Sequence, residues 1–165
     1  MEQDQYNYAN FPKDMQSADF ARFPAHLPVG SAAPDGELID AATGEFTLLS
    51  YLWSEGPLMI EFGLATWPYC RLASPALGDI AEQFNGEGLS FIFLYTSEAH
   101  PGDAWPHHST IEEKVSRARQ FVSDNGLKRR MMVDSLDGQL HQAYGTLPNM
   151  SWIISIVNAS CIKNN

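Results

Sequence analysis

The stretch after the apolar run 58–62 has the residue types and the position that thiol chemistry requires. The run predicts a buried strand and the amphipathic pattern from Arg71 onward predicts a helix, so the stretch joins a strand end to a helix start. Unpaired backbone N–H groups at a helix start stabilise a thiolate. Residues 67–70, WPYC, match the C-x-x-C frame with Trp67 in the first position. Cys70 therefore has two interpretations: a reactive thiol with a low pKa, or a small buried apolar residue.

Glu98 and His100 form a second candidate group. They follow the apolar run 89–95, so they leave a strand end together, where ligands bind in sheets that helices cover on both faces. A carboxylate and an imidazole at that place suit general acid–base work, although such a pair also occurs on plain surfaces. His107 and His108 lie nearby, but no cysteine or carboxylate completes a ligand spacing, so neither a metal nor another cofactor is expected.

Strands and helices alternate along the part of the chain that positions these groups. This order predicts an α/β fold with a mixed central sheet flanked by helices. A hairpin across residues 37–48 is expected to form a small sheet before the main one. The predicted strands are 58–62, 89–95, 131–134 and 152–157, and the predicted helices are 71–84, 110–125 and 139–144.

The clearest helix ends belong to the predicted helix 110–125. Ser109 or Thr110 can cap its start, acidic residues occupy its first turn, and Gly126 ends it. Residues 1–26 lack periodicity and are expected to lie over the domain 27–165, outside its core. His26 and His141 are expected to face solvent.

Composition restricts the class of protein. A chain of 165 residues with 44% hydrophobic content fits one domain, and a net charge of −10 argues against nucleic-acid partners. The basic run 128–130 is expected to be a solvated segment at the start of a strand and to bind nothing. No apolar run reaches the ~20 residues of a membrane span and no signal peptide is evident, so a cytoplasmic protein without a membrane partner is expected. Cys70 and Cys161 are then expected to be free thiols.

Four segments in order resemble motifs of the iodothyronine deiodinase family and its bacterial relatives. Residues 62–68, FGLATWP, resemble F-G-x-x-T-U-P, in which U is selenocysteine or, in some members, cysteine. Residues 95–105, YTSEAHPGDAW, resemble Y-x-E-E-A-H-P-S-D-G-W. Residues 106–115, PHHSTIEEKV, resemble P-Q-H-R-S-L-E-D-R-V, and residues 143–148, AYGTLP, are similar to A-Y-G-A-L-P.

The resemblance implies a thioredoxin-like fold with an N-terminal β-hairpin and a reductive enzyme. A selenolate or thiolate attacks a bound aryl iodide while an acid–base pair protonates the carbon, and a second thiol regenerates the nucleophile. The implied partners are a small aromatic or thiol substrate and a thiol reductant, and a homodimer stays open. By position the nucleophile falls on Trp67, preceded by Thr66, proton delivery falls on Tyr95, Glu98 and His100, and substrate contact falls on His108.

Trp67 departs from the family pattern, because indole has no nucleophilic heteroatom and no N–H that ionises near neutral pH. We therefore expect this chain to be impaired as a deiodinase. A misread codon is an alternative, since tryptophan UGG is one base from UGA and from both cysteine codons. Two other functions stay open: a single-cysteine thiol oxidoreductase or peroxidase that uses Cys70, and a non-catalytic thioredoxin-fold binding protein.

The chain ends before the final helix of the resembled family. We expect the C-terminal helix of the fold to be missing, so that one sheet face near residues 152–157 lacks its cover, with either marginal stability or self-association through that face as the result. Pro148, which precedes this predicted strand, has either a cis or an ordinary trans peptide bond.

Overall fold

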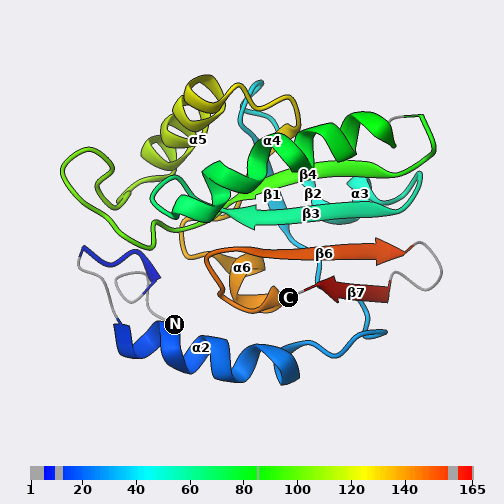
Figure 1. Cartoon of the computed structure of the whole chain (residues 1–165), viewed down its shortest axis with the longest axis horizontal. Coiled ribbons are helices and arrows are strands. Elements are labelled where there is room, and N and C mark those ends of the chain that lie inside the picture. The colour runs from blue at the N-terminus through cyan, green and yellow to red at the C-terminus, as the bar shows by residue number, and fades with distance from the viewer. Residues whose placement is uncertain (1–5, 10–12, 85, 156–159, 165) are drawn as a thin grey trace.

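The structure, a computed structural model, describes residues 6–9, 13–84, 86–155 and 160–164. The strands of this part form one mixed sheet in the order β2-β1-β5-β4-β3-β6-β7 (Figure 1). The strands are β1 Glu37–Asp40, β2 Phe46–Leu48, β3 Leu58–Gly63, β4 Ser90–Tyr95, β5 Arg130–Val133, β6 Met150–Ser155 and β7 Ser160–Asn164. The helices are α2 Lys13–His26, α3 Leu49–Leu52, α4 Pro68–Gln83, α5 Ile111–Asn125 and α6 Gln139–Tyr144.

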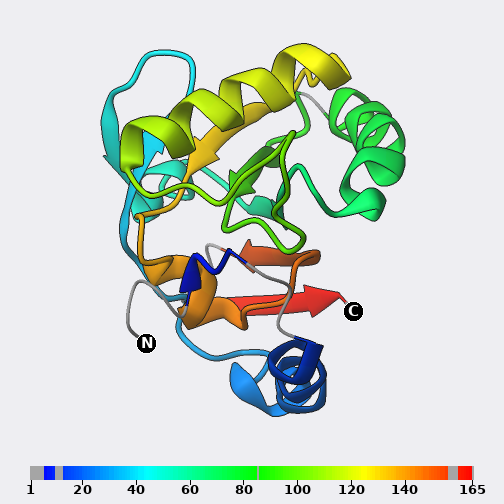
Figure 2. The same ribbon diagram turned by 90° about the vertical axis from the view of Figure 1, so that its left-hand side faces the viewer.

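The central strands β3, β4 and β5 run parallel, and β6 pairs antiparallel with β3. Helices α4 and α5 lie on one face of the sheet, and α2 and α6 lie on the other (Figures 1 and 2). Because both faces are covered, the central strands carry unbroken apolar runs, as the sequence predicts. The mixed sheet with flanking helices is confirmed.

The hairpin of β1 and β2 does not form a separate sheet. β1 also pairs antiparallel with β5, with Ile39 opposite Val133, so the hairpin extends the main sheet at one edge. The prediction of a small preceding sheet is wrong. The apolar pattern of so short a strand shows that it pairs, and it does not show with which neighbours.

Helix α5 begins and ends where its sequence predicts. The Thr110 Oγ1 atom accepts a hydrogen bond from the Glu113 backbone N–H at 3.2 Å, and the Glu113 carboxylate accepts one from the Thr110 N–H at 3.3 Å. Gly126 ends the helix at φ 59°, a left-handed conformation that glycine adopts without strain. These caps fix the helix that packs over the site end of the sheet.

The N-terminal segment contributes to the core, which corrects the expectation that residues 1–26 lie outside it. Phe23 is 3% exposed, and its ring packs at 6.0 Å from the Trp152 ring in a T-shaped contact. Tyr6 is also buried. Sequence periodicity missed α2 because Phe20, its other described phenylalanine, is exposed and Pro24 lies within the helix.

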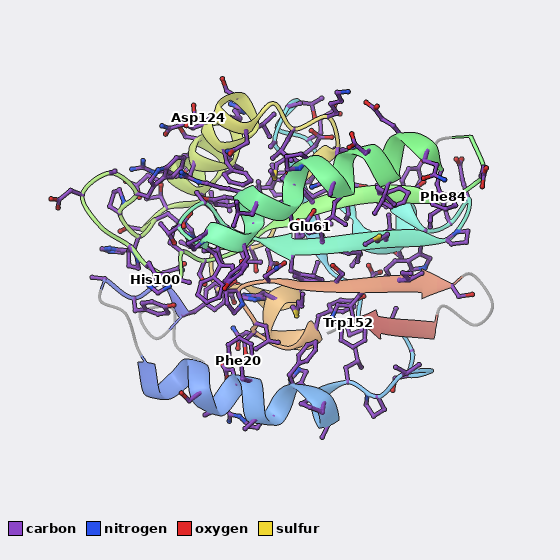
Figure 3. All side chains as sticks on the ribbon, viewed as in Figure 1. Phe20, Glu61, Phe84, His100, Asp124 and Trp152 are labelled. Atoms are coloured by element: carbon purple, nitrogen blue, oxygen red, sulfur yellow. The ribbon has the colours of Figure 1, made fainter. Side chains whose placement is uncertain are left out.

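Of the two sheet faces near residues 152–155, the one that Trp152 and Ile154 present is covered, so the expected uncovered face is the opposite one, to which Ile153 belongs. Trp152 is fully buried between β6 and α2, and the Tyr144 ring of α6 packs against it at 5.5 Å (Figure 3). On the opposite face Ile153 stays 36% exposed. The N-terminal helix therefore supplies the cover on one face only. Residues 156 and 157 of the predicted last strand lie outside the described residues.

Candidate active site

The two candidate segments meet at one edge of the sheet. Since β3 and β4 are parallel, both end at this edge, and the Thr96 backbone N–H donates to the Gly63 carbonyl at 2.9 Å. Figure 3 places His100 in the loop beyond these strand ends. Gly63 is required at the end of β3, because a Cβ atom there would lie 2.4 Å from the Phe93 ring and 3.0 Å from the Cys70 Sγ.

The Glu98 carboxylate lies at the centre of this arrangement. It is 2% exposed and accepts hydrogen bonds from the backbone N–H groups of Ala65 at 3.4 Å and Thr66 at 2.8 Å. The Tyr95 hydroxyl donates a short hydrogen bond to the same carboxylate. Glu98 therefore joins the end of β4 to the two residues that precede Trp67, and all of these donors are neutral.

Thr66 and Trp67 are both in contact with His100. The Thr66 Oγ1 accepts from the His100 backbone N–H at 2.9 Å. The Trp67 and His100 rings are parallel within 1°, with centroids 5.4 Å apart. Trp67 is the N-cap residue of α4, and Pro68 follows at the first helical position, where its missing N–H costs nothing. The side chain at position 67 therefore lies beside an imidazole at a helix start.

Tyr95 and His108 are buried beside this carboxylate. Burial and the negative charge of Glu98 raise the pKa of Tyr95 well above its usual value, so Tyr95 stays a hydrogen-bond donor. His108 is 1% exposed, its ring lies 6.3 Å from the Tyr95 ring, and neither of its nitrogens has a partner among the described residues. Burial, with Lys114 nearby, lowers the pKa of His108 to about 3, so its ring is neutral.

Cys70 lies beneath the site and is fully buried. Its Sγ donates to the Pro148 carbonyl at 3.6 Å, and burial, together with the charges of Glu61 and Glu98, raises its pKa to about 12. A helix start lowers the pKa of a thiol, but here the loss of water around the buried Cys70 raises it by more. Of the two interpretations of Cys70, the geometry favours a buried apolar residue. All peptide bonds of the described residues are trans, Pro148 included.

A pocket of about 580 Å³ opens beside these residues. Thr66, Arg71 and His100 form part of its wall, and Trp105 lines one side. The guanidinium groups of Arg71 and Arg117 lie 5.9 and 5.7 Å from the centre of the Trp105 ring, within the range of cation–π contacts. The pocket wall therefore combines aromatic rings with one guanidinium group, Arg71, and one carboxylate, Asp103.

Two further buried polar groups were not anticipated from the sequence. Glu61, in the middle of β3 beneath α4, forms an ion pair of 2.5 Å with Arg129, and both side chains are 3% exposed (Figure 3). His141, expected to face solvent, is 3% exposed and hydrogen-bonds the Tyr6 hydroxyl at 2.9 Å and the Leu147 carbonyl at 2.8 Å. A charged residue inside an apolar strand was the available signal for Glu61, whereas His141 gave none.

Two negative findings concern the described residues alone. No cluster of three or more histidine, cysteine or acidic residues among them could hold a metal ion. No helix in the same part of the chain is long and apolar enough to cross a membrane.

Comparison with solved structures defines the class of fold. The thioredoxin domain of a thiol-disulfide oxidoreductase from Bacteroides vulgatus superimposes with a TM-score of 0.65 at 15% identity, over 84% of this chain and 89% of that one. A peroxidoxin from Mycobacterium tuberculosis gives a TM-score of 0.60 at 20% identity, over 84% and 86%. The chain thus has the thioredoxin-like fold that the sequence implies.

Comparison of sequences defines the family. The family model described as iodothyronine deiodinase matches residues 13–159. The type II iodothyronine deiodinase of Fundulus heteroclitus is 30% identical over 133 residues, which cover 72% of this chain and 47% of that protein. The chain belongs to the iodothyronine deiodinase family. It spans about half the length of the curated relatives that it matches.

Proposed function

We propose that the chain carries the proton-handling part of a reductive deiodination site, with position 67 as the place of the attacking atom. One observation carries this proposal. The buried Glu98 carboxylate binds the amides of the two residues before Trp67, while the His100 ring lies against the residue 67 side chain. An acid–base group is therefore fixed beside the position that the family resemblance gives to selenocysteine or cysteine.

The proposed reaction divides into an attack and a proton transfer. A thiolate or selenolate at position 67 takes iodine from an aryl iodide, and the ring carbon takes a proton that Glu98 and His100 supply or relay. Two equivalents of thiol then release iodide and restore the nucleophile. The second thiol comes from a separate reductant, since Cys70 is fully buried with a pKa of about 12.

The proposed substrate is a small iodinated phenol. The aromatic rings of Trp105 and His100 suit a flat ring, and Arg71 in the pocket wall suits a phenolate or carboxylate. His108 is buried next to Tyr95, so we propose that it positions the loop beside the pocket and does not itself touch the substrate. We also propose that the protein is cytoplasmic, because thiol reductants are abundant in the cytoplasm.

With Trp67 in place the chain is proposed to bind such a ligand without turning it over, because indole has no nucleophilic atom. The experiment replaces Trp67 with cysteine and measures iodide release from an ortho-iodinated phenol in the presence of dithiothreitol. Iodide release is expected from Trp67→Cys, and none from the unaltered chain. Sequencing codon 67 from independent nucleic-acid preparations tests whether a misread selenocysteine or cysteine codon underlies Trp67.

Trp67→Ser is the matched control, since serine has nearly the same volume as cysteine but is a far weaker nucleophile. Circular dichroism and alkylation of the introduced thiol verify folding and access. Iodide release from Trp67→Cys at the rate of Trp67→Ser, in a folded protein with an accessible thiol, would count against the proposal.

A second function, a non-catalytic thioredoxin-fold binding protein, is favoured by Trp67 itself. It predicts that the unaltered chain binds the iodinated phenol and that Trp67→Cys adds no reaction. Both functions predict binding by the unaltered chain, so iodide release from Trp67→Cys separates them, and equilibrium dialysis of the phenol with both proteins verifies that the ligand is bound. The third function, thiol chemistry at Cys70, is the least supported because burial keeps that thiol protonated.

A further inference from the structure

A second pocket, of about 230 Å³, lies at the opposite end of β5 from the candidate active site. Arg130 begins β5, whereas Tyr95 of the candidate site pairs with Val133 at the other end of this strand. Arg119 of α5 and Asp40 of β1 complete the polar lining. The pocket is therefore built by three elements and is separate from the redox site.

Three arginines line this pocket, and each is anchored by one side of its guanidinium group. The Arg119 Nε donates a short hydrogen bond to the Ala41 carbonyl, and the Arg130 Nε donates to Asp40 at 2.7 Å. Arg129, 8% exposed, donates through its terminal nitrogens to Glu61 and Ser74.

The anchored arginines keep unused donors. The terminal nitrogens of Arg119 and Arg130 have no acceptor among the described residues, and neither does the buried Nε of Arg129. Burying an N–H group without a partner is costly, so the Arg129 Nε indicates a missing acceptor, whereas Arg119 and Arg130 are exposed and present their terminal nitrogens to an incoming ligand.

Charge at the pocket also favours an anion. The three arginines face two carboxylates, Asp40 and Glu61, which leaves a local excess of one positive charge (3 − 2) in a chain of net charge −10. Val122 and Met131 form an apolar part of the lining. Planar guanidinium groups match the oxygens of a phosphate group better than an ammonium does.

We propose that this pocket binds one phosphate group, either as inorganic phosphate or as the end group of a small phosphate monoester. Arg119 and Arg130 supply the direct contacts from the two sides of the pocket, and Arg129 supplies charge from its floor. Arg129 and Arg130 of the basic run 128–130 are thereby assigned a ligand, whereas Lys128 pairs with Glu82. The inference does not rest on the proposed redox function, because the two sites lie at opposite ends of the sheet.

The experiment titrates the full chain with inorganic phosphate and with phenyl phosphate by isothermal titration calorimetry, at constant ionic strength set with potassium chloride. Saturable binding of at least one of them is expected. Arg119→Gln is expected to weaken it about tenfold, the loss of one hydrogen bond to a charged group. Arg119→Lys keeps the charge but loses the planar donors, so its affinity is expected to lie between those of the unaltered chain and Arg119→Gln.

Arg22→Gln is the matched control, because it removes the same charge from the exposed face of α2 and breaks only local contacts within that helix, the pair with Asp19 and a hydrogen bond to the Ala18 carbonyl. It is expected to bind as the unaltered chain does. Tighter binding of phenyl phosphate identifies an ester as the ligand class, and tighter binding of inorganic phosphate identifies the free anion. Absence of saturable binding for both compounds, or an equal loss in Arg22→Gln and Arg119→Gln, would overturn the proposal.

Discussion

Two buried glutamates, Glu61 and Glu98, both raise the pKa of Cys70 and are stabilised in different ways. Glu61 is paired with Arg129 in the middle of the sheet. Glu98, at the strand end, is held by the Tyr95 hydroxyl and two backbone N–H groups, and no cation of the described residues forms an ion pair with it. Each is 2% exposed, so burial alone does not distinguish them.

The difference shows which buried carboxylate suits proton exchange. Burial raises the pKa of Glu61 to about 7 against the opposing effect of Arg129, yet this group faces no substrate pocket and its partner is fixed by Ser74. Glu98 binds the backbone that leads into position 67, next to a pocket. Here the reacting carboxylate is therefore identified better by which groups donate hydrogen bonds to it, and by where those groups lie, than by a perturbed pKa.

The largest expected effect comes from breaking the Glu61 pair. Arg129→Met leaves a buried carboxylate without its cation, and we expect a loss of about 3–5 kcal/mol in the free energy of unfolding. The double variant Glu61→Met/Arg129→Met is expected to recover most of this loss. Urea unfolding followed by circular dichroism measures both.

Arg130→Met is the neighbouring control for this experiment. Its pair with Asp40 is half exposed on the arginine side, so a loss below about 1 kcal/mol is expected. A loss of similar size in Arg129→Met and Arg130→Met would show that the Glu61 pair is no more important than a surface contact.

The next effect tests Glu98 in catalysis. In the Trp67→Cys background, Glu98→Gln is expected to reduce iodide release about 100-fold, the usual contribution of a general acid–base group. Glu61→Gln in the same background is expected to change stability and leave the rate of the folded protein unchanged. Equal rate losses in the two variants would remove the distinction between the two glutamates.

A smaller effect is expected from the hydroxyl that holds Glu98. Tyr95→Phe in the Trp67→Cys background removes one hydrogen bond to a carboxylate, so we expect about a tenfold lower rate. Because the pKa of Tyr95 is raised well above its usual value, the shape of the pH–rate profile is expected to stay the same. A profile that loses its alkaline limb in this variant would instead make Tyr95 a proton donor.

The smallest effect concerns His108, a buried group without a partner among the described residues. Its pKa is lowered to about 3 in the folded chain, whereas an unfolded histidine titrates near 6.5. The unfolded chain therefore takes up a proton first, and stability is lost as pH falls below about 6.5. We expect a loss of roughly 1 kcal/mol between pH 7.5 and 5.5.

His108→Leu isolates this contribution, because the similar effect of His141, whose pKa is lowered to about 4, is present in both proteins. The difference in unfolding free energy between the two proteins, measured in urea at each pH, is expected to follow the titration of one histidine. A difference that does not vary with pH would mean that His108 is charged or exposed in the fold.

Much of the fold follows from sequence periodicity, because the central strands and α5 bury whole faces. α5 also carries its own caps, so its ends were predicted within one residue. The helix α2 was missed because its contact with the core depends on Phe23, which packs on Trp152 far along the chain. α3 and β7 were missed as well, and short elements at the sheet margins have little pattern to read.

The meeting of Glu98 and His100 with residues 66 and 67 could be expected, since parallel strands bring their carboxyl ends to one edge. The hydrogen-bond and ion-pair partners of these groups could not be expected from the sequence. Nothing in the spacing indicates that Glu98 binds backbone amides, or that Arg129, 68 residues away, pairs with Glu61. The burial of the Cys70 thiol likewise depends on how closely Gly63 and Phe93 pack around it.

The parallel stack of Trp67 on His100 also gives this site an optical signal. Indole fluorescence responds to ring contacts and to surrounding water, and Trp67 is only half-buried beside the pocket, whereas Trp152 is sealed inside the core. A molecule that enters against His100 displaces or extends this stack and changes the emission of Trp67, together with that of Trp105 in the pocket wall. Occupancy can therefore be followed without a label, with Trp67→Phe as the spectroscopic blank.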